Sequence, residues 1–289
     1  AAQVVVMFIA MTLMLITGIN EIGGIETFFT KLTTVSPTYL NLFPADVQGS
    51  VFTIVLFVLG YVAGGIGIVA QPHIMIRFMA LDDPNHMKQA RAYYYCSYFS
   101  FCVVTFFVGL SARLIFPDVS AFDSELALPM MTTQLLPEIL VGLVLAGIVA
   151  ASMSTADSQI LGCSAALTED IINQPDNSVW LRRFATAIVT AIALCIALLE
   201  LDSVFGLVLY AWSVLAAAFA PLIILYALGE KLTEIRALLV MVTCTAIALA
   251  WRAMGWGDVV YEVAPAMFFG IIGYFFLLKP FLGAPEATK

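Results

Sequence analysis

The sequence predicts an all-α membrane protein with about eight transmembrane helices, and three observations support this class. Of the 289 residues, 62% are hydrophobic and only 11% are charged. The mean hydropathy is +1.01, which leaves too little polar surface to cover a soluble domain of this size. The apolar residues are also gathered into long segments that alternate with short polar ones. We therefore expect an all-helical bundle.

Each apolar segment is near or beyond the roughly 20 residues that a helix needs to cross a bilayer. In chain order the segments cover approximately residues 1–18, 51–80, 92–115, 137–161, 180–200, 203–228, 234–252 and 260–282. The first segment starts inside an apolar run, with no initiator Met and no basic stretch that would indicate a signal peptide. We therefore interpret residues 1–289 as a single transmembrane domain that is a fragment of a longer chain.

The 12 Lys and Arg residues predict an orientation. If the first helix ends outside, only Lys31, Arg113 and Arg252 lie outside, and the other basic residues lie inside. Cytoplasmic loops carry the excess of Lys and Arg, so both ends of the sequence, including the C-terminus, are expected in the cytoplasm. The loops 19–50 and 116–136 are then external. Residues 124–137 are expected to form a short helix, which is either a lid or a passive interfacial connector.

Several functions receive no support from the sequence. The net charge of −8 comes from acids concentrated in loops, and no basic or aromatic pattern for nucleic acid occurs. The 5 cysteines occur singly, which favours small buried hydrophobic roles over disulfides or metal binding. His73 and His86 have no patterned partners, so a structural role is favoured for both. The absence of nucleotide-binding and catalytic motifs predicts that the protein is not an enzyme.

Hydroxyl side chains inside the apolar segment 137–161 indicate a cation site. The run from Ala146 reads Ala-Gly-Ile-Val-Ala-Ala-Ser-Met-Ser-Thr-Ala-Asp-Ser. At 3.6 residues per turn, one helix face carries Ala151, Ser154, Thr155 and Ser158. Oxygen ligands of this kind suit a hard cation. Asp157 lies within a turn of this face and must meet a partner or a wet cavity. A second cation and hydrogen bonds to neighbouring helices are equally good explanations for it.

The segment 51–80 contains a second unusual pattern. Between Leu59 and Pro72 it places four glycines close together, namely Gly60, Gly64, Gly65 and Gly67. This composition weakens a helix, and free backbone groups at membrane depth are tolerated only where protein or a water-filled cavity receives them. The pattern therefore indicates an unwound helix that lines a solute cavity. Small residues that permit close helix packing explain the same pattern equally well.

Three short runs carry a resemblance to a known family. They are Gln71-Pro-His-Ile-Met-Ile-Arg-Phe-Met-Ala80, Met153-Ser-Thr155 and Thr168-Glu-Asp170. In these runs and their order, the sequence resembles the sodium/solute symporter family, the group that contains bacterial proline permeases. The resemblance covers essentially the whole chain and implies a leucine-transporter-like, inverted-repeat helical bundle. On that mapping the sequence is the C-terminal portion, with core helices five to ten at about 1–228 and peripheral helices at 234–282.

The resemblance also implies which residues bind ion and solute. The main sodium site would use the Ala151 carbonyl and the hydroxyls of Ser154 and Thr155, and Asp157 with Ser158 would match a second site. The solute site is implied at Gly64, Gly65, Gly67, Ile68, Gln71, Tyr210 and Trp212. Proline permeases resemble one another in having Trp and Tyr where this sequence has Gly64 and Ile68, so a wider or more apolar pocket is expected. Tyr210 and Trp212 also fit an interfacial aromatic belt.

The function that this resemblance implies is secondary active transport. Sodium would be the coupling ion for import of a small organic solute, an amino acid such as proline or a carboxylate. The partners would be the solute, sodium and the lipid bilayer, with no nucleic acid, and the location would be the bacterial plasma membrane. Two other classes stay open, namely a symporter-like sensor module of a signalling protein and a channel-like leak pathway.

Overall fold

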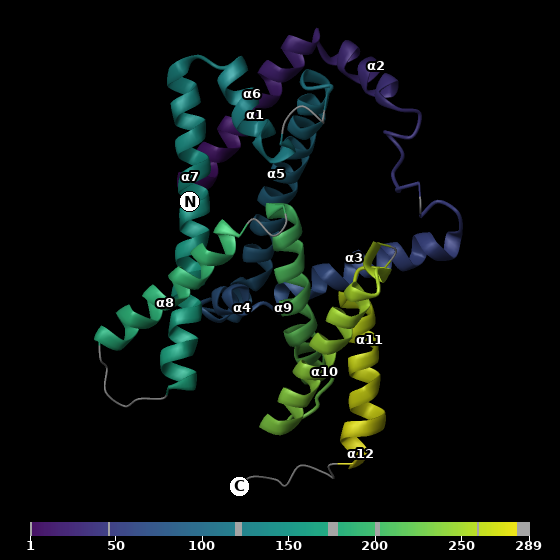
Figure 1. The fold of residues 1–289 in the computed structure, drawn as a ribbon, viewed down its shortest axis with the longest axis vertical. Helices are drawn as coiled ribbons and strands as arrows, with labels where there is room; N and C mark the ends of the chain where they lie inside the picture. The colour runs from purple at the N-terminus through teal and green to yellow at the C-terminus, as the bar shows by residue number, and fades with distance from the viewer. Residues whose placement is uncertain are drawn as a thin grey trace. The chain divides into compact units, whose positions relative to one another are not determined.

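The computed structural model describes residues 2–45, 47–118, 123–172, 179–199, 203–258 and 260–281. Every regular element in these ranges is a helix (Figure 1). Within them, 7 helices are long and apolar enough to cross a membrane, which confirms the prediction of an all-α membrane protein. The helices form two compact units, Ala1–Leu40 with Leu81–Leu201 and Asn41–Ala80 with Asp202–Lys289.

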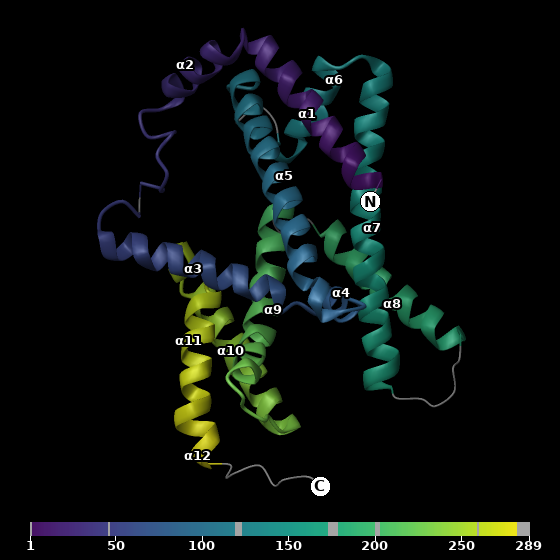
Figure 2. The same cartoon turned by 180° about the vertical axis from the view of Figure 1, so that it is seen from behind.

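The first unit is built around α1. It contains α1 (Ala2–Ile22), α2 (Ile25–Val35), α5 (Met87–Ile115), α6 (Ala127–Leu135), α7 (Glu138–Ala165) and α8 (Val179–Leu198). Figure 2 shows α1 beside α5 and α7. The main core of this unit brings together buried side chains of these helices, including Met14, Val108, Met131 and Val144. Beyond α7 a π-helical turn (Ala166–Ile171) follows directly.

The short helix predicted in residues 124–137 is present as α6, after a 3₁₀ turn at Ser124–Leu126. Its side chains Met131 and Thr132 are fully buried, and the Thr132 hydroxyl lies 3.7 Å from the Met14 sulfur. The helix ends at Leu135 because the residue before Pro137 is restricted to an extended conformation. Within its own unit α6 therefore packs on α1 through these two buried side chains, and both interpretations of the helix stay predictions.

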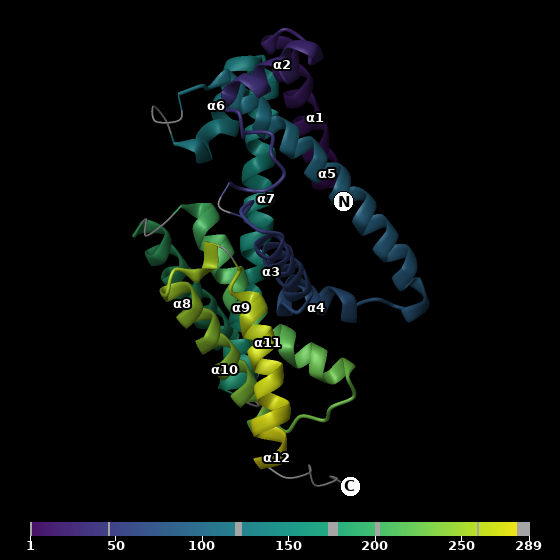
Figure 3. The same ribbon diagram turned by 90° about the vertical axis from the view of Figure 1, so that its right-hand side faces the viewer.

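The second unit surrounds α9 (Val204–Ala227). It also contains α3 (Val51–Val69), α4 (Pro72–Met79), α10 (Glu234–Ala253) and α11 (Val263–Gly273), which continues through a π-helical stretch into α12 (Lys279–Phe281). Figure 3 shows α9, α10 and α11 gathered together, and α3 packs on α9 and α11. Small buried residues at these contacts, including Ala216, Ala217, Ala220 and Ala266, allow close approach of the helices.

Some boundaries differ from the predicted segments. The segment 51–80 is divided into α3 and α4, and the predicted loop 19–50 contains the amphipathic helix α2, which buries Phe28 and Leu32. The eighth predicted span, 260–282, corresponds to a shorter apolar helix at Val263–Leu278. The end of that predicted segment and the tail after it lie outside the described residues.

Candidate functional site

The predicted ion-site residues lie on one uninterrupted helix. Because α7 is regular from Glu138 to Ala165, the predicted face exists, and it continues the face that carries Val144 and Gly147. Val144 is buried in the core around α1, and a side chain at Gly147 would lie 2.9 Å from the Met7 sulfur. Helix α1 therefore covers the first half of this face. The second half carries Ala151, Ser154, Thr155 and Ser158, of which only Ala151 is even partly buried.

The hydroxyls of this face bind their own helix backbone. Thr155 Oγ1 donates to the Ala151 carbonyl at 3.1 Å, and Ser158 Oγ donates to the Ser154 carbonyl at 2.8 Å. A hydroxyl that donates its one proton keeps two lone pairs. The Ala151 and Ser154 carbonyls accept both a backbone N–H of the regular helix and this hydroxyl proton, so both of their lone pairs are in use. Each carbonyl would bind a cation beside its hydroxyl once the hydroxyl proton turns away from it. The arrangement is suited to binding part of a cation shell.

Asp157 lies beside this face and is exposed. In the described part of the chain its carboxylate makes no hydrogen bond or ion pair. The explanation of Asp157 by hydrogen bonds to neighbouring helices therefore finds no bonding residue among the described ones. No cluster of three or more His, Cys, Asp or Glu side chains suitable for a metal occurs among the described residues. The face of α7 itself offers hydroxyl and carbonyl oxygens, with the Asp157 carboxylate beside them.

The glycines of α3 do not interrupt the helix. It runs without a break from Val51 to Val69, and the structure thus differs from the expectation of an unwound glycine segment. Three of the glycines face close neighbours: a Cβ at Gly60 or Gly64 would lie 2.9 or 2.8 Å from Tyr261, and one at Gly67 would lie 2.3 Å from the Ala216 Cβ. These three glycines serve close packing. Gly65 has no atom within 4 Å of such a Cβ and faces open space.

The break in this segment lies at Ala70 and Gln71. Proline disfavours the helical conformation in the residue before it, and Gln71 is accordingly extended, with φ −68° and ψ 134°. Pro72 then occupies the first turn of α4, where its missing N–H is not needed. Gln71 is 1% exposed, and its Nε2 is the buried side-chain nitrogen that finds no hydrogen-bond partner in the described part of the chain. Ile68, one turn earlier, is half-buried.

Tyr210 and Trp212 lie near the start of α9, each about 40% exposed (41% and 40%). One face of the Tyr210 ring is covered, because the Arg252 guanidinium lies 5.0 Å from its centroid. Arg252 also pairs with Glu262 at 3.2 Å, and the Glu262 side chain is only 3% exposed. Tyr210 therefore packs on the Arg252–Glu262 ion pair of its own unit. This position does not distinguish a residue that caps the solute pocket from one in an interfacial aromatic belt.

Comparison with known proteins identifies the family. The model of the sodium:solute symporter family matches residues 1–244. The chain belongs to this family. One similar curated protein is the high-affinity proline transporter PutP of Bacillus subtilis, which is 28% identical over 95% of this chain and 59% of the relative. Another is the sodium/proline symporter of Escherichia coli, which is 30% identical over 78% of this chain and 47% of the relative. Sodium/proline symporter 2 of Staphylococcus saprophyticus is 29% identical, over 96% of this chain and 56% of the relative. The chain thus spans roughly half the length of these relatives.

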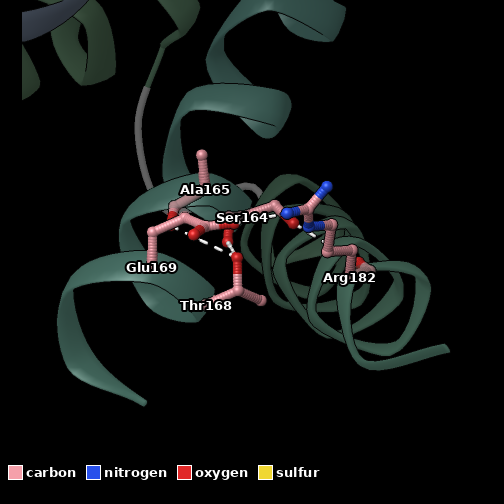
Figure 4. Close-up of polar contacts among 5 residues, drawn as sticks. All are labelled: Ser164, Ala165, Thr168, Glu169 and Arg182. Carbon is pink, nitrogen blue, oxygen red and sulfur yellow. Dashed lines mark hydrogen bonds and ion pairs between the residues drawn. The ribbon is translucent and has the colours of Figure 1, made fainter. Parts of the chain in front are cut away.

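In this member of the sodium:solute symporter family, the Thr168-Glu-Asp170 run contacts α8 directly after the end of α7. Figure 4 shows Thr168 hydrogen-bonded to the carbonyls of Ser164 (2.9 Å) and Ala165 (3.3 Å), and Glu169 paired with Arg182 of α8 at 2.9 Å. Ser164 Oγ lies 2.8 Å from Thr186 Oγ1. Both members of the Glu169–Arg182 pair are more than half exposed, so the pair adds little stability. The hydrogen bond between the Ser164 and Thr186 hydroxyls is less exposed, so it contributes more to the contact between the end of α7 and α8.

Two residues missed at the sequence level join the helices of the second unit. Tyr261 and Glu262 precede α11, and in the sequence they look like ordinary interfacial residues at the end of an apolar segment. The structure brings Tyr261 against α3 and α9, and Glu262 against Arg252. The available signal was Glu262 itself, since a carboxylate directly before a strongly apolar helix needs a partner.

Proposed function

We propose that this chain is the C-terminal portion of a sodium-coupled symporter that imports a small organic solute, an amino acid such as proline or a carboxylate. The observation that carries the proposal is the oxygen face of α7, where Thr155 Oγ1 and the Ala151 carbonyl lie 3.1 Å apart within a family named for sodium:solute symport. The proposed roles need no covalent chemistry. The names of the relatives are those of transporters, so the sensor alternative gains no support.

The proposed main sodium site uses the Ala151 carbonyl with the hydroxyls of Ser154 and Thr155. A hard cation takes six or more oxygens in the comparable case of Ca²⁺, so other parts of the complete transporter must supply the rest. Asp157 and Ser158 are proposed for a second sodium. Both units belong to one transporter domain in this proposal, with leucine-transporter-like topology, in the bacterial plasma membrane and with the C-terminus in the cytoplasm.

The proposed solute site combines α3 and α9. Gln71 supports a solute with hydrogen-bond acceptors, because a buried donor without a partner costs about 1–3 kcal/mol and a carboxylate oxygen would satisfy it. Gly65 and Ile68 border the site on α3, and Tyr210 with Trp212 border it on α9. Gly64 and Gly67 contribute by letting neighbours approach the helix, as their contacts with Tyr261 and Ala216 indicate. A screen of sodium-dependent uptake over labelled amino acids and carboxylates, proline among them, identifies the solute.

The test is sodium-driven uptake of labelled proline by the full-length protein in proteoliposomes. Replacing Ser154 and Thr155 together by Ala removes two ligands, and hydrogen bonds to charged groups contribute about 1.5–3 kcal/mol each. The sodium concentration for half-maximal uptake should therefore rise at least tenfold. Ser152→Ala is the matched control, because Ser152 also donates to its own backbone, at Ile148 (3.0 Å), but lies off the face. A double variant with the same sodium dependence as the control would exclude the site.

A further inference from the structure

Two residues at the end of α10 contact Val260 and Glu262, directly before α11. The Trp251 indole N–H donates to the Val260 carbonyl at 3.0 Å, and Arg252 Nη1 lies 3.2 Å from Glu262 Oε1. The Glu262 carboxylate is almost fully buried, so this ion pair and its hydrogen bond are strongly preferred over separation of the two charges. Tyr261 lies between the two anchored residues, and its position is therefore determined by α10.

From this position Tyr261 fills the space beside the glycine face of α3. Its backbone nitrogen is 2.9 Å from the place of a Cβ on Gly60, and its ring carbon Cε1 is 2.8 Å from the place of a Cβ on Gly64. The two glycines are four residues apart and thus share one helix face. The Tyr261 ring also stacks on Tyr61, with centroids 5.9 Å apart and planes 15° from parallel. No larger residue fits at either glycine unless Tyr261 moves.

The same side chain binds the start of α9. The Tyr261 hydroxyl donates to the Leu209 carbonyl at 3.1 Å, directly before Tyr210. A phenol has an ordinary pKa of about 10, so it remains a hydrogen-bond donor at physiological pH. Near the C-terminal end of α3, Gly67 lies directly against Ala216 of α9. The two helices are therefore joined directly at Gly67 and through Tyr261 at Gly60 and Gly64.

We propose that Tyr261 is a positioning residue: it fixes the start of α9, and Tyr210 with it, against the glycine face of α3, and thereby sets the affinity for the solute. The solute part of this inference rests on the proposed function. We call the contacts of Tyr261 with Gly60, Gly64 and the Leu209 carbonyl the Tyr261 clamp. The clamp goes beyond the proposed function, because it assigns a role to the turn between the two peripheral helices. Those helices contribute no proposed ion or solute ligand.

The decisive variant is Tyr261→Phe, which removes one hydroxyl and keeps the ring against Gly60, Gly64 and Tyr61. Tyr61→Phe is the matched control: it removes the hydroxyl of the stacked partner, which makes no hydrogen bond within the described residues. Deuterium exchange over residues 204–213 is measured on the full-length protein in lipid nanodiscs, and proline uptake is measured in proteoliposomes. For Tyr261→Phe alone we expect faster exchange in this segment and a half-saturating proline concentration about fivefold higher, as the loss of one hydrogen bond predicts.

Exchange over 204–213 that matches the wild type and Tyr61→Phe would overturn the clamp. Faster exchange with an unchanged half-saturating proline concentration would leave Tyr261 a purely structural residue and overturn its positioning role. If the wild-type protein takes up no proline and the screen yields no other sodium-dependent solute, the proposed function fails, while the exchange measurement still decides whether the clamp exists.

Discussion

Gly67 offers a direct test of how α3 packs on α9. In Gly67→Ala the new Cβ would lie 2.3 Å from the Ala216 Cβ and 3.2 Å from its Cα, against an optimum of about 3.5–4.0 Å between carbon atoms. No rotamer change relieves a contact between two β carbons, so the helices must separate. Overpacking costs about 1–3 kcal/mol, and we take the upper end here. Replacing a helical glycine by Ala returns about 1 kcal/mol, which leaves a net loss of about 2 kcal/mol.

The matched variant is Gly65→Ala, two residues away on the open side of the helix. It has the same gain in helix propensity without the clash, so it should be slightly stabilising. Thermal unfolding in detergent, followed by size-exclusion fluorescence, should show a midpoint for Gly67→Ala about 3 °C below wild type for a chain of this length. Adding Ala216→Gly to Gly67→Ala should restore most of the loss, because the interfering methyl group is removed. A Gly67→Ala protein as stable as Gly65→Ala would refute the packing interpretation of these glycines.

Two further predictions concern charged groups. Asp157→Asn should keep the fold but lower the Hill coefficient for sodium and shift the solute-to-sodium ratio toward one if Asp157 binds a second sodium; altered thermal stability with unchanged sodium dependence would exclude that site. At Glu230, the hydrogen bond from Lys279 holds the carboxyl pKa below its ordinary value of 4.5, so this contact stabilises the fold above that pH and is lost as the pH falls through the lowered pKa. The difference in unfolding midpoint between wild type and Lys279→Met should therefore be constant above about pH 4.5 and shrink in more acidic solution; a difference that persists there would argue against an ionic contact.

The membrane-spanning helices could be predicted from the sequence because the length of an uninterrupted apolar run decides where they form. A run of about 20 apolar residues has few alternatives to a spanning helix, and α7 therefore lies where its pattern predicts. The shared face of Ala151, Ser154, Thr155 and Ser158 follows from helix geometry alone. The binding of sodium to this face stays a prediction, since it depends on ligands beyond this helix.

The glycines of α3 show why the rest could not be predicted. A glycine both weakens a helix and permits close packing, and which effect decides depends on the neighbour that it meets in space. For Gly60, Gly64 and Gly67 those neighbours are Tyr261 and Ala216, about 150–200 residues further along the chain. The interruption of the segment was instead decided locally by Pro72, through its restriction on Gln71. A local rule thus located the break, and distant contacts kept the glycine stretch helical.

The backbone-bonded hydroxyls of α7 also bear on how the protein is made. Ser152, Thr155 and Ser158 each donate to a carbonyl one turn earlier. Their hydroxyl protons are therefore hydrogen-bonded within α7 even when no other helix is beside it. Asp157 carries an insertion cost of about 2.5–3.5 kcal/mol at a bilayer centre, which several Leu, Ile and Val residues at about −0.3 to −0.6 kcal/mol each can offset. Helix α7 can therefore enter lipid on its own, before it packs against the helices that would complete a cation shell.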